Sequence, residues 1–157
     1  MTQRPDLTTV VHEGVWRGED AEDDRLVREM LDEAQQFIEG FGWCRRVCET
    51  YIGIAIGAVV GVFLAHIDAS EPEVDEWIWV VVGDIPSAYI TVEDAPTPAA
   101  ALDGYVGAMQ EWVRAVRAGA PVDELIPVDV PPSEEHADML ATRLEFIDRE
   151  ILPMYEG

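Results

Sequence analysis

Apolar residues recur with the 3.6-residue period of a helix in three stretches of the chain. The first covers residues 20–39, opens with acids that favour the positive end of a helix dipole, and stops before Gly40. The second starts at Thr97, a good N-cap, has Pro98 at its first helical position, and runs to Gly119. Both stretches predict amphipathic helices that bury one face.

The third helical stretch lies near the end of the chain. It follows Pro131 and Pro132, and Ser133 is its predicted N-cap. Pro153 is its predicted end, because proline lacks the N–H group that a helix interior needs.

Between the first and second helices the pattern changes to short runs of β-branched residues, which are typical of strands. Gly57 and Ala58 predict a type II′ turn between two of these runs. The third run, from Trp77 to Val82, is apolar on both faces. The predicted strands are residues 49–56, 59–67, 77–82 and 88–92, and Thr8 to His12 is a candidate edge strand.

These elements predict one α+β domain over residues 1–157, with residues 1–18 as a tail or edge strand. The expected order is α-β-β-β-β-α-α. We expect a four-stranded antiparallel meander with the three helices packed on one face.

The run from Tyr51 to Ile67 has seventeen residues without a formal charge when His66 is neutral, and it therefore also fits a short membrane helix. Gly53, Gly57 and Gly61 even match the small-xxx-small spacing of packed membrane helices. Its many β-branched residues favour strands instead, so we expect no membrane contact. No apolar leader opens the chain and Cys44 and Cys48 are only four residues apart, which predicts a cytoplasmic protein with reduced thiols.

Charge is the most unusual property of the sequence. The chain has 32 Asp and Glu residues against 10 basic residues, a net charge of −22. We therefore expect no direct binding to nucleic acid, whose phosphates would be repelled unless a metal or a local basic patch intervened, and anionic membrane surfaces are disfavoured likewise. The acid is densest at residues 19–24 and 71–76.

Candidate catalytic chemistry is sparse. The sequence has no phosphate-binding glycine loop, and no cofactor or metal is expected. Cys44, Cys48 and His66 could form a nucleophile or metal cluster, although buried structural cysteines are the commoner interpretation. Asp84, in a turn between strands, could act with Asp75 as an acid–base pair, but many turn aspartates only bond their own backbone.

The leading hypothesis is an acidic inhibitor of immunity-protein, antitoxin or nucleic-acid-mimic type, which occludes a basic protein such as a nuclease or toxin. Trp16 or Trp77 would anchor the partner. A small metal-dependent or cysteine-based enzyme and a self-associating scaffold are the alternatives. The predicted partner-binding residues are Glu19, Asp20, Glu22, Asp23, Asp24, Glu71, Glu73, Asp75, Glu76 and Trp77.

Overall fold

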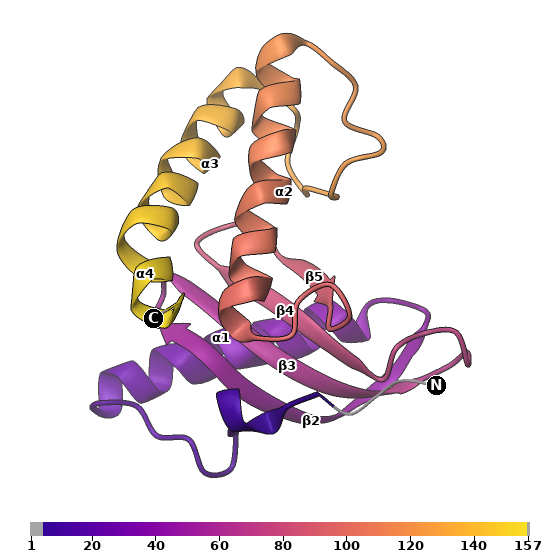
Figure 1. Ribbon diagram of the computed structural model, residues 1–157, viewed down its shortest axis with the longest axis vertical. Helices are drawn as coiled ribbons and strands as arrows, with labels where there is room; N and C mark the ends of the chain where they lie inside the picture. The colour runs from indigo at the N-terminus through magenta and orange to yellow at the C-terminus, as the bar shows by residue number, and fades with distance from the viewer. Residues whose placement is uncertain (1–4, 157) are drawn as a thin grey trace.

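The computed structural model describes residues 5–156. At its centre is an antiparallel sheet of five strands, which follow one another in chain order (Figure 1). The α+β class and the meander are confirmed. The sheet has five strands rather than four because residues of the tail pair with Ile52 and Tyr51. The strands are β1 (Val11–His12), β2 (Cys44–Ile56), β3 (Val60–Ala69), β4 (Trp77–Gly83) and β5 (Ala88–Thr91).

The helices are α1 (Ala21–Glu39), α2 (Pro98–Ala118), α3 (Glu134–Phe146) and a short α4 (Leu152–Glu156). Helices α2 and α3 begin directly after their predicted N-caps, and α1 begins one residue after the predicted start at residue 20. Asp20, Thr97 and Ser133 each accept a hydrogen bond from a backbone N–H group of the first turn, which satisfies a donor that has no partner within the helix.

The prediction that all helices cover one face of the sheet is wrong. Helix α1 packs on one face, where Val27 and Ile38 meet Phe63 and Val80. The other face is covered by a second core cluster that includes Trp112 of α2 and residues of α3. Because successive residues of a strand point to opposite faces, a central strand that is apolar throughout needs a cover on both sides.

The β2–β3 hairpin also differs from the prediction. Strand β2 begins at Cys44, five residues earlier than expected, and bulges interrupt its pairing with β3. The positive φ of the turn falls on Ala58 (64°) rather than on Gly57, so the turn is not type II′, which places positive φ at its first central residue.

Helix α3 does not end at Pro153. It continues through a π-helical segment (η2, Ile147–Ile151) into α4, which contains Pro153. A proline ring collides with the carbonyl four residues earlier in a regular α-helix, and a wider π-turn just before the proline relieves that crowding.

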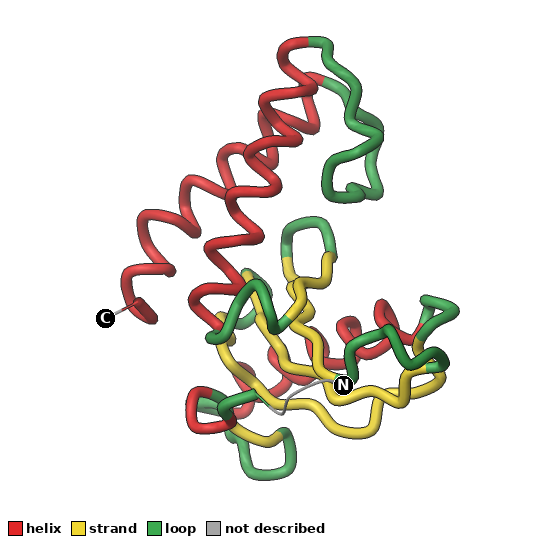
Figure 2. The backbone as a smooth tube through the Cα atoms, turned by 45° about the vertical axis from the view of Figure 1, so that its right-hand side comes forward, coloured by secondary structure: helices red, strands yellow, loops and turns green. Residues whose placement is uncertain are grey.

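The helices α2 and α3 lie side by side and extend away from the sheet, and the connection between them turns back toward it (Figures 1 and 2). Helix α1 lies across the opposite face. Of the helices within residues 5–156, none combines the length and the hydropathy that crossing a bilayer requires.

Candidate functional site

A groove runs along the β4–β5 loop and the start of β5 and is also lined by the connection between α2 and α3. It consists of two adjoining cavities of about 480 and 420 Å³, a size typical of ligand-binding pockets. Phe37, Ser87 and Asp129 line both cavities, so we treat them as one site and call it the β5 groove. Its walls come from α1, the β4–β5 loop, residues 126–130 and α3.

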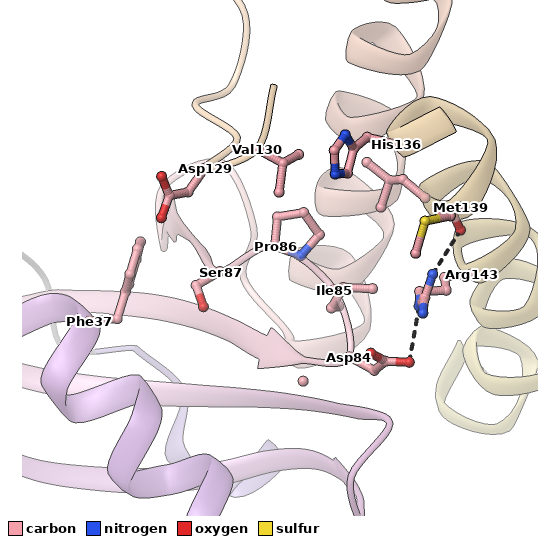
Figure 3. A pocket seen from close by; sticks show the side chains of 12 residues that line it. Phe37, Asp84, Ile85, Pro86, Ser87, Asp129, Val130, His136, Met139 and Arg143 are labelled. Carbon is pink, nitrogen blue, oxygen red and sulfur yellow. Dashed lines mark hydrogen bonds and ion pairs between the residues drawn. The ribbon is translucent and has the colours of Figure 1, made fainter. Parts of the chain in front are cut away.

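One end of the groove is polar (Figure 3). The guanidinium of Arg143 donates to the carboxylate of Asp84 at 3.0 Å and to the backbone carbonyl of Met139 at 3.3 Å. The Nδ1 atom of His136 lies 2.7 Å from the hydroxyl oxygen of Ser133, the N-cap of α3. The positive charge of Arg143 is therefore balanced by the carboxylate of Asp84.

The other end of the groove is aromatic. Phe41 stacks on Trp43 with 5.0 Å between ring centroids, and it meets Phe37 and Tyr89 edge to face. Tyr89 is 39% exposed, so part of this cluster faces solvent. Opposite the cluster, Ile126, Pro127 and Val128 form an apolar wall.

The floor of the groove is held by a buried tyrosine. Tyr105 of α2 is completely inaccessible to solvent and donates its hydroxyl to the carbonyl oxygen of Pro86 at 2.6 Å. Burial raises the pKa of Tyr105, so the phenol stays protonated and remains a donor. This contact fixes the β4–β5 loop against α2.

A second surface feature is the solvent face of α1. The buried residues of α1 lie on one side of the helix, and carboxylates occupy the exposed side from the first turn to the last. We call this surface the acidic ridge. It consists of Glu22, Glu29, Asp32, Glu33 and Glu39.

The predicted acidic group at residues 19–24 turns out to be largely structural. Asp20 caps α1, and the carboxylate of Asp23 accepts the N–H of Glu19. Asp24 accepts the N–H of Gly18 and also pairs with an arginine, and these contacts lower the pKa of its carboxyl group. Acids are stabilising at this end of a helix in any case.

The predicted group at residues 71–76 lies near the other end of α1. Val74 packs into the core beneath α1. Burial and then the negative charges of Glu39, at the end of α1, and Asp68, in β3, raise the pKa of the Cys44 thiol, so both carboxylates lie near it. A helix of 19 residues is about 28 Å long, so the two predicted acidic groups lie at opposite ends of the acidic ridge. The ridge connects them, but they do not meet in one patch.

The predicted aromatic anchor is not on the surface. Trp77 is 6% exposed and stacks on the ring of His66, with 4.2 Å between centroids. Trp16 is half-buried and lies under the guanidinium of Arg28, 5.6 Å from its ring centroid. Exposed aromatic side chains are found instead at Tyr89, in the groove, and at Phe146 and Tyr155, outside it.

Of the candidate catalytic residues, Cys48 lies next to Glu49, the cross-strand partner of His66, and the ring of His66 stacks on Trp77. Cys44 is buried, and this burial raises the pKa of its thiol, whereas Cys48 is exposed. Asp75 precedes β4 and Asp84 follows it, so the strand, about 23 Å long, separates them. Within the described part of the chain, no group of three or more His, Cys, Asp or Glu side chains could hold a metal ion.

No family model matches this chain, and neither the curated proteins nor the solved structures give a significant match. The groove cannot be predicted from the sequence because its walls come from distant segments. Asp84 and Arg143, for example, are 59 residues apart. The ridge carries a clearer signal, since exposed acids recur on the polar side of the predicted helix at residues 20–39.

Proposed function

We propose that this chain is an acidic protein-binding inhibitor of the immunity-protein, antitoxin or nucleic-acid-mimic type, and that it occludes a basic partner such as a nuclease or toxin through the acidic ridge. The observation that carries the proposal is the placement of three ridge carboxylates, Asp32, Glu33 and Glu39, where they do not help the helix. The other two, Glu22 and Glu29, pair with Arg25. Glu33 follows Glu29 by four residues, a like-charge spacing that destabilises a helix. Glu39 lies at the negative end of the helix dipole, and the last turn has no basic residue.

The overall charge supports the same proposal. No Asp or Glu is buried within the described residues, so the net charge of −22 is carried on 8724 Å² of accessible surface, about one net charge per 400 Å². A field of this strength accelerates encounter with a basic surface and disfavours acidic competitors. The carboxylates of the ridge would occupy the positions of substrate phosphates in a basic active site.

The test compares two triple variants with the same change in charge. The ridge variant is Asp32→Asn with Glu33→Gln and Glu39→Gln. The matched control lies on exposed positions of the third helix and the π-helical segment, and consists of Glu135→Gln, Asp148→Asn and Glu150→Gln. None of these six carboxylates has a hydrogen-bond or ion-pair partner within residues 5–156.

Wild type and both variants are immobilised and exposed to a lysate of the native host at low salt, and the retained proteins are quantified by mass spectrometry. We expect one basic protein to be retained by wild type and control, with about tenfold weaker retention by the ridge variant. If the purified partner is a nuclease, wild type and the control variant should inhibit its activity, and the ridge variant should not. Equal retention by all three baits, or equal loss from both variants, would contradict the proposal.

Stability gives an independent readout of the same variants. Since Glu33 and Glu39 oppose helix formation, the ridge variant should melt at a higher temperature than wild type at low ionic strength. A gain in stability together with a loss of binding is typical of a functional surface. A ridge variant that melts below wild type would show that these carboxylates have a structural role.

A further inference from the structure

The two edges of the sheet are protected very differently. On the β1 side, β2 extends beyond its short partner, and the uncovered stretch carries Arg45, Arg46 and Glu49. Charged side chains on an exposed edge oppose pairing with another chain. On the opposite side, β5 has the sequence Ala-Tyr-Ile-Thr without any charge. Its outer side has no backbone hydrogen-bond partner within residues 5–156.

We propose that the β5 groove binds an extended basic segment of a partner protein, which adds to the sheet as a sixth strand beside β5. Strand addition at an open edge draws its affinity from backbone hydrogen bonds and its specificity from pockets for alternate side chains. With four residues, β5 offers about 13 Å of edge, enough for a short segment.

The walls of the groove supply the pockets for alternate side chains. Tyr89 points toward Phe41 and Trp43 on the α1 side of the sheet. Ile90 packs against the core cluster on the other side, together with Ile126 and Val128 of the connection. An added strand would therefore find aromatic contacts on one face and aliphatic contacts on the other.

The charge of the groove selects a basic segment. Asp129 lines both cavities and has no hydrogen-bond or ion-pair partner within the described residues. The arginine at the polar end, Arg143, is already bound to Asp84. A second copy of this chain would bring a further net charge of −22 to the contact, so self-association through this edge is disfavoured.

The inference goes beyond the acidic ridge, because it requires a strand-forming segment in the partner and not only positive charge. The probe is a capped peptide of alternating arginine and valine. Its matched control has the same sequence with methylated backbone nitrogens, which keeps the charge but removes every N–H donor that could pair with β5. A third peptide replaces arginine by glutamate.

Binding is measured by calorimetry, and hydrogen exchange locates the bound peptide on the protein. We expect the basic peptide to bind and to slow exchange at Ala88–Thr91, and the methylated peptide to bind at least about tenfold more weakly. The glutamate peptide should not bind. Asp129→Asn should weaken binding of the basic peptide, whereas Glu124→Gln, on the same connection but outside the groove, should not.

Equal affinity of the basic peptide and its methylated form would overturn the inference, because charge alone would then explain the binding. Protection of other segments without β5 would overturn it as well. Both results would leave the proposed function standing, since the ridge is tested by its own pair of triple variants.

Discussion

Replacing Tyr105 by phenylalanine isolates one contact that shapes the groove. The ring packing is kept, but the carbonyl of Pro86 loses the hydroxyl that donates to it at 2.6 Å. Loss of a hydrogen bond to a partly buried carbonyl costs about 1–2 kcal/mol in the free energy of unfolding. In a domain of this length each kcal/mol lowers Tm by about 2–4 °C. Calorimetry should therefore show Y105F melting about 2–8 °C below wild type.

The matched control is Tyr89→Phe, because the hydroxyl of Tyr89 has no hydrogen-bond partner among the described residues and the side chain is 39% exposed. We expect Y89F to melt within about 1 °C of wild type, as surface changes of this kind do. If Y105F and Y89F melt at the same temperature, the contact between Tyr105 and Pro86 does not hold the loop.

The alkaline side of the stability curve gives a second readout for Tyr105. Its pKa is raised in the folded chain above the ordinary value of 10.0. Above that pH the unfolded chain releases the proton and the folded chain keeps it, so stability falls as pH rises. The full contribution is present below pH 10.0. Y105F lacks this group, so its unfolding free energy should fall less steeply above that pH than that of Y89F.

Four further variants test the fold. Thr50→Val removes a buried hydroxyl from a side-chain network and should lower the unfolding free energy by about 1–3 kcal/mol in urea titrations; an unchanged midpoint would contradict this network. Gly83→Ala should destabilise the fold strongly, because Gly83 has a φ of 139° and an added Cβ would lie 2.3 Å from a backbone oxygen. Gly107 lies in open space on a helix, so Gly107→Ala should stabilise the fold by about 0.5–1 kcal/mol. Equal melting temperatures of these two variants would refute the comparison. The hydrogen bond from the Gly18 N–H lowers the pKa of the Asp24 carboxyl group in the folded chain. Asp24 therefore stabilises the fold above pH 3.8, and this contribution is lost as the pH falls through the lowered pKa. Asp24→Asn should flatten the acid limb of the stability curve. An unchanged acid limb would show that Asp24 does not contribute.

The sequence predicts those parts of the fold that depend on neighbouring residues. Asp20, Thr97 and Ser133 start their helices because each places a side-chain oxygen beside a free N–H a few residues later. Such signals need no knowledge of the tertiary structure, which is why they can be read from one chain. The candidate edge strand from Thr8 to His12 is present only at Val11–His12, because Leu7–Thr9 forms a 3-10 helix.

The arrangement of helices around the sheet depends on distant contacts and is harder to predict. Strand β4 is apolar on both faces, with Ile78 in one core cluster and Trp79 in the other. That pattern implies two covered faces, but it does not say which helix covers which face. Ile147 and Ile151, in the π-helical segment before Pro153, are likewise buried in the core.

The proposed function rests on the difference between acidic residues that stabilise the fold and acidic residues that do not. This difference becomes visible only in the structure. Asp20 and Asp24 satisfy backbone donors at the start of α1, so their presence needs no partner protein. Asp32, Glu33 and Glu39 satisfy no donor within residues 5–156, and two of them weaken the helix that carries them. A surface acidified only for solubility predicts that the two triple variants behave alike. A recognition surface predicts that binding is lost from the ridge alone.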